Sequence, residues 1–243
     1  MLTRMATRTR ARPSRFGRVV LVAAIVLAAL LVAADRIGLL VAERAAADTL
    51  QQSQHLQRRP DVSIGGFPFL TQLATGTFDS IHVTADDLTV ADGNTQLLVA
   101  KLDVTLQHVH VSRDFRSARS ESSTAVALVR YSDLSHTLGT QVSYAGAGRI
   151  GASAAVGVVP GVTVPAAATA AIRVQGDALV FQDVQVSLAG QAVPPGLSSY
   201  FTGLFGNAIS LRGLPFGVRV HSVTAAADGV TVTLTAPGLT FRR

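Results

Sequence analysis

The chain has 243 residues, a formal net charge of +6 at pH 7 and no cysteine. The lack of cysteine excludes disulfides, thiol catalysis and cysteine-ligated metals, and a chain of this length can bury a sizeable core without cross-links. The charge belongs to an N-terminal tail: six arginines precede the first acidic residue, Asp35, and from there on 15 basic and 15 acidic residues balance. With no RNA- or DNA-binding motif present, we expect no nucleic-acid partner.

An apolar segment, Val19 to Ala34, follows the basic tail of residues 1–18. As a helix it would be about 24 Å long, slightly shorter than a hydrocarbon core of about 30 Å. Because arginines precede it, residues 35–243 are predicted to lie as one exported domain on the outer side of the cytoplasmic membrane. The segment is either a single-pass transmembrane anchor or a signal peptide cleaved after Val32-Ala33-Ala34.

A helix is predicted for residues 35–57, which are rich in Ala, Leu and Gln, and Pro60 ends it. Helical character that continues beyond the apolar segment favours an anchor over a cleaved signal. Helix and anchor would then form one rod. The alternative is an ordinary helix that covers one face of a sheet.

Alternation of apolar and polar residues predicts a series of β-strands from Val62 onward. The expected strands are 61–65, 77–84, 87–91, 95–111, 123–130, 140–146, 149–159, 162–174, 178–188, 217–226, 229–235 and 238–242. Turn residues between them, such as Asp92-Gly93-Asn94, indicate an antiparallel meander. The strand 95–111 alternates so strictly that one sheet face should be dry, with Leu102, and the other wet, with Lys101.

Two more helices are predicted to interrupt the strands. The first is residues 131–138, with Gly139 as its C-cap. The second begins at Pro194-Pro195 and continues through Phe205, with apolar residues at helical spacing.

The most distinctive motif lies between Arg59 and Val90: V-x-I-G-G-F-P-F-L, then G-T-F and I-x-V. Gly65-Gly66 allows backbone angles closed to other residues and Pro68 fixes one angle, so a strand, a rigid apolar corner and a second strand are expected. A second motif, L-P-F-G-V, begins at Leu214, and Asp35-Arg36-Ile37 follows the apolar segment. Together these motifs resemble the LmeA family of phospholipid-binding proteins from actinobacterial cell envelopes.

The expected fold class is α+β. A long curved antiparallel β-sheet would wrap around the N-terminal helix and the second helix of the C-terminal half. An apolar groove like that of tubular lipid-binding domains would remain between sheet and helices. The alternative is a closed β-sandwich without a cavity.

Seven of the 13 aromatic residues (ten Phe and three Tyr) lie in the first motif or in and just before the second. Such residues belong either to a core or to the lining of an elongated apolar cavity, as lipid sites require. The resemblance favours the cavity. The expected lipid-binding residues are Phe67, Phe69, Leu70, Phe78, Tyr200, Phe201, Phe205 and Phe216.

Three arginines, Arg113, Arg116 and Arg119, follow the longest strand. Arginine can bind a phosphate through two parallel hydrogen bonds, so these are the expected headgroup residues. The alternative is a solvated loop with ion pairs to Asp114 and Glu121.

A histidine pair, His108 and His110, would share the face of Leu106 unless a bulge intervenes, and could bind a metal if a third ligand joined them. The sequence suggests no third ligand, and it contains no nucleophile elbow, phosphate-binding loop or H-E-x-x-H motif. We therefore expect no metal, no cofactor, no catalytic residue and no enzymatic activity.

The resemblance implies a phospholipid-binding protein that holds acyl chains in an apolar groove and acts in cell-envelope lipid or lipoglycan assembly. The expected partners are a phospholipid and the cytoplasmic membrane. The alternative is a structural or partner-binding envelope domain without a lipid cavity.

Overall fold

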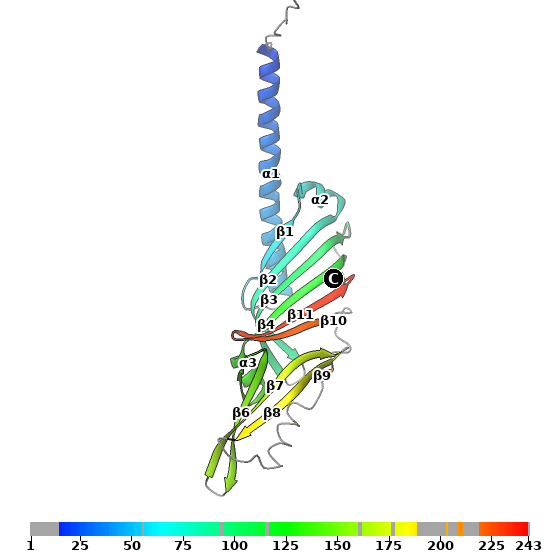
Figure 1. The fold of residues 1–243 in the computed structure, drawn as a ribbon. Coiled ribbons are helices and arrows are strands. Elements are labelled where there is room, and N and C mark those ends of the chain that lie inside the picture. The colour runs from blue at the N-terminus through cyan, green and yellow to red at the C-terminus, as the bar shows by residue number, and fades with distance from the viewer. Residues whose placement is uncertain are drawn as a thin grey trace, which may run out of the picture.

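The computed structural model describes residues 15–54, 56–92, 95–114, 117–159, 162–175, 178–188, 203, 209–210 and 219–242. A long N-terminal helix leads into a body of two antiparallel sheets (Figure 1). The predicted α+β class is confirmed. The sequence could not show that the strands divide into two sheets, because the strands of both sheets have the same alternation of apolar and polar residues.

Helix α1 (Arg15–Ser53) joins the apolar segment and the predicted helix after Asp35 into one rod. It ends at Ser53, four residues before the predicted end, and its 39 residues extend about 58 Å. The helix is long and apolar enough to cross a membrane. Its first half projects from the body and its second half lies beside the first sheet (Figure 1).

The first sheet has the strand order β1-β2-β3-β4-β11-β10, and β12 also pairs with β4. Its strands are β1 (Asp61–Gly65), β2 (Thr77–Asp92), β3 (Thr95–Val111), β4 (Ser117–Val129), β10 (Arg219–Ala226), β11 (Gly229–Pro237) and β12 (Thr240–Arg242). The predicted strands 77–84 and 87–91 are one strand. It continues through Asp87 although that residue has a left-handed φ of 53°.

A short helix, α2 (Phe69–Thr75), occupies the place of the predicted rigid corner, so that detail of the prediction was wrong. The residues after Pro68 lack strand alternation and hold good helix formers. Gly76 ends the helix with a φ of 71°, and its carbonyl accepts a hydrogen bond of 2.7 Å from the Val111 N–H. A Cβ at Gly76 would lie 2.7 Å from the Val111 carbonyl oxygen, which requires glycine there.

The second sheet has the order β5-β6-β7-β8-β9. Its strands are β5 (Gln141–Tyr144), β6 (Arg149–Val159), β7 (Val162–Gln175), β8 (Ala178–Leu188) and β9 (Ile209–Ser210). Helix α3 (Tyr131–Leu138) precedes it and ends at Gly139, as predicted. The predicted helix from Pro194 to Phe205 falls, apart from Gly203, outside the described residues.

Small side chains join the two sheets. Ala166, Ala168 and Ala170 of β7 are fully buried in a cluster that includes Ala225 and Val230 of the first sheet. Alanine allows two backbones to approach closely, so β7 and β10 pack directly against each other.

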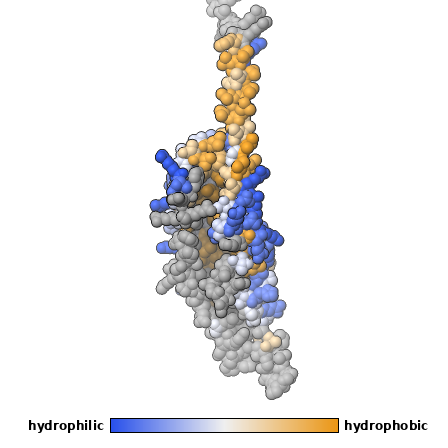
Figure 2. Space-filling view, turned by 180° about the vertical axis from the view of Figure 1, so that it is seen from behind, coloured by the Kyte–Doolittle hydropathy of each residue, from blue (hydrophilic) through white to orange (hydrophobic). Residues whose placement is uncertain are grey.

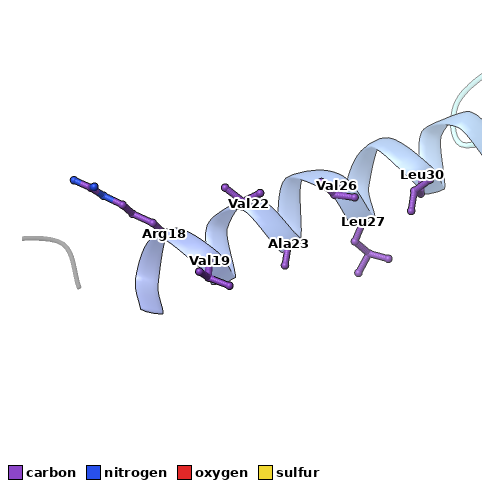
Figure 3. A pocket seen from close by; sticks show the side chains of 7 residues that line it. All are labelled: Arg18, Val19, Val22, Ala23, Val26, Leu27 and Leu30. Carbon is purple, nitrogen blue, oxygen red and sulfur yellow. The ribbon is translucent and has the colours of Figure 1, made fainter. Parts of the chain in front are cut away.

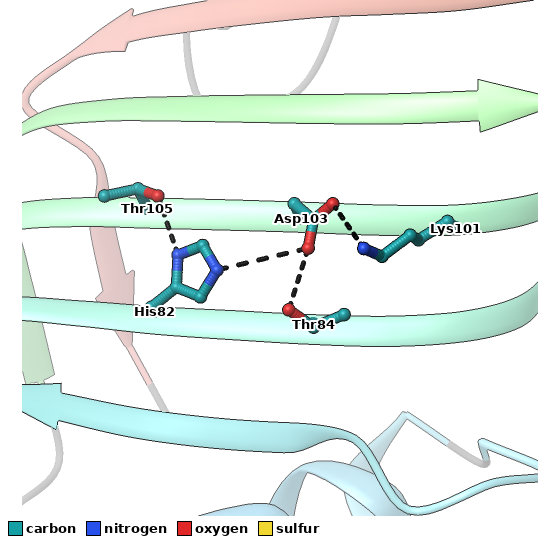
Figure 4. A network of polar contacts seen from close by, with 5 residues as sticks. All are labelled: His82, Thr84, Lys101, Asp103 and Thr105. Carbon is teal, nitrogen blue, oxygen red and sulfur yellow. Dashed lines mark hydrogen bonds and ion pairs between the residues drawn. The ribbon is translucent and has the colours of Figure 1, made fainter.

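The outer face of the first sheet is polar along β2 and β3, as predicted for the strand 95–111. His82, Thr84, Lys101, Asp103 and Thr105 form a network across β2 and β3 (Figure 4). The Thr84 hydroxyl donates a hydrogen bond of 2.8 Å to Asp103. This bond, with a smaller contribution from Lys101, holds the pKa of Asp103 below its usual value, although partial burial opposes the shift. An ionised network of this kind belongs on a solvated face.

Candidate functional site

The inner face of the first sheet carries an apolar row across six strands. The cross-strand partners in this row are Val62, Val83, Val104, Ala125, Leu234 and Val220. A second row, from β2 to β10, holds Ala85, Leu102, Ala127, Val232 and Val223. Partners directly opposite each other point to the same face, so the rows form one continuous apolar surface.

This inner apolar face is lowest along β4. Ala125 lies between Val104 and Leu234, and alanine is much shorter than either neighbour. All three residues are half-buried. The body shows a recessed hydrophobic area beside α1 (Figure 2). The apolar row is therefore lowest at Ala125, and we call the apolar surface on both sides of this residue the trough.

The α2 end of the inner apolar face is closed by a packed cluster. Phe69, Phe78 and Val109 are its buried centre, and Leu39 and Ala42 of α1 pack against it. The rings of Phe69 and Phe78 are 6.3 Å apart. At the opposite end, Val223 and Val232 pack against the core between the two sheets. The trough thus extends from the α2 cluster to the core between the sheets.

The predicted lipid-binding residues of the first motif fall into two groups. Phe69 and Phe78 are core residues, only 1% and 6% exposed. Phe67 and Leu70 lie on the outer surface of the α2 turn, 61% and 42% exposed. The structure therefore does not bring all four to one cavity surface. Tyr200, Phe201, Phe205 and Phe216 lie outside the described residues.

Two of the predicted headgroup residues, Arg113 and Arg119, are exposed at the α2 end of the sheet, while Arg116 lies outside the described residues. The register shows this position: Arg119 is opposite His110, and His110 is opposite Thr77, the first residue after the α2 turn. Sequence spacing alone could not place these arginines, because their position depends on how three strands pair.

The histidine pair does not lie on the face of Leu106, because the alternation shifts at His108. That residue has a left-handed φ of 47°, and Leu106 and Val109, three residues apart, join the same core cluster. Both histidines are exposed beside Glu121, at 3.5 Å from His108 and 3.8 Å from His110. Across the described residues, no group of three or more acidic or histidine side chains is placed to hold a metal.

Asp35 has a role that sequence analysis missed. Although it directly follows the apolar segment it is buried, and its Oδ1 accepts a hydrogen bond of 2.8 Å from the Leu70 N–H. Arg36 contacts the other carboxylate oxygen at 3.1 Å and lies 4.9 Å from the Phe67 ring centroid. The Leu70 hydrogen bond holds the pKa of Asp35 below its usual value, against an opposing effect of burial. The signal available in the sequence was an acid immediately after an apolar helix.

The apolar part of α1 also has a shallow depression, between Arg18 and Leu30 (Figure 3). Its other lining residues are Val19, Val22, Ala23, Val26 and Leu27. All of them belong to one exposed helix, so the depression is an open apolar surface rather than an enclosed site. It is suited to contact with lipid chains, not to the binding of a polar ligand.

Comparison with known protein families gives a match over most of the chain. The model of a family described as LmeA-like phospholipid-binding matches residues 33–235. No individual curated protein and no solved structure matches the chain.

Proposed function

This chain belongs to the LmeA-like phospholipid-binding family, and from that premise we propose that it holds a phospholipid with its acyl chains against the inner apolar face of the first sheet. The observation that carries the proposal is the continuous apolar row from Val62 to Val220, which is half-buried at its centre. The centre of this row is Ala125, the smallest side chain in it.

Acyl chains fit this surface for a simple energetic reason. Each methylene group removed from water contributes about 0.8 kcal/mol, so even partial burial of one chain gives substantial affinity. The trough requires no polar group along its length, because an acyl chain has none. Its lining by Val, Leu and Ala matches that requirement.

The headgroup would lie at the α2 end of the trough. Arg113 and Arg119 are exposed there, and a phosphate is the anion that an arginine side chain binds best. This orientation places the acyl chains toward the second sheet and the phosphate toward the end from which α1 leaves the body. Nothing in the function requires catalysis, and we propose a binding protein rather than an enzyme.

The apolar part of α1 would anchor the body to the outer side of the cytoplasmic membrane. The arginine-rich tail before Val19 stays in the cytoplasm under the positive-inside rule, so the sheets face outward. A lipid held there could be presented or moved during assembly of the cell envelope, including its lipids and lipoglycans.

Two substitutions on one strand test the groove. Ala125→Phe fills the trough, whereas Thr124→Phe adds the same side chain at an exposed position on the outer face. Phospholipid extracted from purified protein should fall several-fold in Ala125→Phe and stay at the wild-type level in Thr124→Phe. Equal phospholipid content in both variants and the wild type would contradict the proposed position of the acyl chains.

A further inference from the structure

Six apolar residues are exposed where α1 meets the body. They lie on one turn region of α1 and on the adjoining α2 turn, and each is at least 39% exposed: Ile37, Leu40, Val41, Phe67, Leu70 and Leu73. We call this set the apolar collar. A soluble surface usually shows apolar residues singly, and a group of six at one level of the molecule calls for a partner.

The apolar collar is continuous with the membrane-spanning part of α1. Residues 19–34 alone give about 24 Å, which is less than a hydrocarbon core of about 30 Å. Extension to Val41, within the same unbroken helix, gives about 34 Å. The collar thus continues the apolar surface of the segment into the headgroup layer, and the remaining collar residues, on α2, lie at the same level.

Two charged residues at the level of the collar, Asp35 and Arg36, have partners that offset the cost of removing them from water. Asp35 accepts hydrogen bonds from the Leu70 N–H and from Arg36, and the Arg36 guanidinium lies over the Phe67 ring. A carboxylate with these partners can enter the headgroup region at a much lower desolvation penalty than an unpaired one. An arginine stacked on an aromatic ring is likewise suited to the interface between water and lipid.

The charge around the apolar collar also fits a lipid surface. Arg113 and Arg119 are exposed at the same end of the sheet. Basic residues near an anionic membrane contribute about 1 kcal/mol each to its binding. Apolar residues with arginines at the same end of the molecule are a common composition of a surface that rests in the headgroup layer.

We infer that the apolar collar docks into the outer headgroup layer of the membrane that holds α1. This inference rests on the membrane placement in the proposed function. Docking would fix the α2 end of the sheet against the bilayer, so that the proposed headgroup arginines face membrane phosphates and the inner apolar face begins at the membrane surface. The body is then in direct contact with the bilayer and is not attached to it through α1 alone.

The chain contains no tryptophan, so one introduced tryptophan reports its own surroundings. We would reconstitute full-length Phe67→Trp in vesicles of phosphatidylcholine and phosphatidylglycerol and measure its emission, its quenching by acrylamide and its quenching by brominated phospholipids. Tyr144→Trp, at an exposed position of the second sheet, is the matched control. Leu73→Trp is a second collar reporter in case Phe67→Trp does not fold.

Docking predicts blue-shifted emission, several-fold weaker acrylamide quenching and strong quenching by brominated lipid for the collar reporters, but not for Tyr144→Trp. Emission and quenching equal to those of Tyr144→Trp would overturn the inference. Protection from acrylamide without quenching by brominated lipid would also overturn it, because a second copy of the chain would then cover the collar.

The same reporters in the Ala125→Phe background separate this inference from the proposed function. Lipid quenching that persists after the trough is filled shows bilayer contact rather than a lipid in the groove. Lipid quenching that disappears with the groove lipid would overturn docking while it supported lipid binding. Phospholipid content per chain, measured on each preparation, reports the groove independently of the collar.

Discussion

Asp35 and Leu70 are joined by a hydrogen bond of 2.8 Å between the Asp35 Oδ1 and the Leu70 backbone N–H. This bond connects the end of the apolar segment of α1 to the first turn of α2, across 35 positions of sequence. It also satisfies one of the N–H groups that a helix leaves without an internal partner at its N-terminus. Gly38 lies next to this bond, and a Cβ there would be 3.3 Å from Leu70 Cδ2, so the two helices are in direct contact.

We predict that Asp35→Asn lowers the melting temperature at neutral pH, because the charged acceptor of the Leu70 N–H is lost. The folded protein lowers the pKa of Asp35 below its ordinary value of 3.8. The stabilisation is therefore present above pH 3.8 and disappears as the pH falls through the lower pKa of the folded state. Thermal unfolding of both proteins over this pH range should show the two melting temperatures converging in acid.

Asp48→Asn is the control for that series, because Asp48 is an exposed partner of Arg59. Exposed ion pairs contribute little to stability, so this substitution should change the melting temperature much less than Asp35→Asn does. A difference between wild type and Asp35→Asn that stayed constant into strong acid would show that the charge of Asp35 is not the cause.

Gly76→Ala should destabilise the protein more than Gly139→Ala. Both glycines have a left-handed φ, 71° and 63°, so each alanine introduces about 1 kcal/mol of backbone strain. At Gly76 the new Cβ would also lie 2.7 Å from the Val111 carbonyl oxygen, whereas among the described residues it would meet open space at Gly139. We expect a further loss of about 1–3 kcal/mol at Gly76, measured by denaturant unfolding. Equal losses would mean that the contact with Val111 relaxes freely.

Truncation of the two phenylalanines that flank Pro68 should change the free energy of unfolding by very different amounts. Phe69→Ala removes a buried ring from the cluster under α2 and should reduce the free energy of unfolding by about 3–5 kcal/mol. Phe67→Ala removes an exposed ring and should change it by about 0.5 kcal/mol or less. Denaturant unfolding separates these values, and a large loss for Phe67→Ala would contradict its surface position.

Reversal of the arginine charges should weaken uptake of anionic phospholipid. For Arg113→Glu with Arg119→Glu we expect a loss of at least about 1 kcal/mol for each position, or about thirtyfold or more in total. Arg173→Glu with Arg219→Glu changes the net charge equally at other exposed positions. Vesicle transfer assays with phosphatidylglycerol would compare the two. Equal uptake by both double variants would mean that neither Arg113 nor Arg119 contacts the headgroup.

Local patterns predicted much of the fold. Period-two alternation located the strands, Gly139 marked the end of α3, and Leu102 and Lys101 were assigned to the correct faces. Local patterns did not predict the positions where a strand is irregular. The left-handed φ of His108 shifts the alternation of β3. Histidine is enriched in that conformation, but the conformation is uncommon for every residue other than glycine, so the pattern did not locate the shift.

The site was harder to predict than the fold, because it depends on pairing between distant segments. Phe67 and Phe69 are two residues apart in one apolar motif, yet one is on the surface and the other is in the core. Ala125, at the lowest point of the trough, is an ordinary alanine in the sequence. Its position becomes meaningful only when Val104 and Leu234 are known to be its neighbours.

The most direct test of the central claim is the phospholipid content of the full-length chain, purified from membranes in a detergent that does not resemble a lipid. Native mass spectrometry should find about one tightly held phospholipid per wild-type chain, consistent with a single elongated apolar site, and almost none on Ala125→Phe. A lipid-free wild-type protein that also takes up no phospholipid from vesicles would contradict the claim, and would favour a structural or partner-binding role for the inner apolar face.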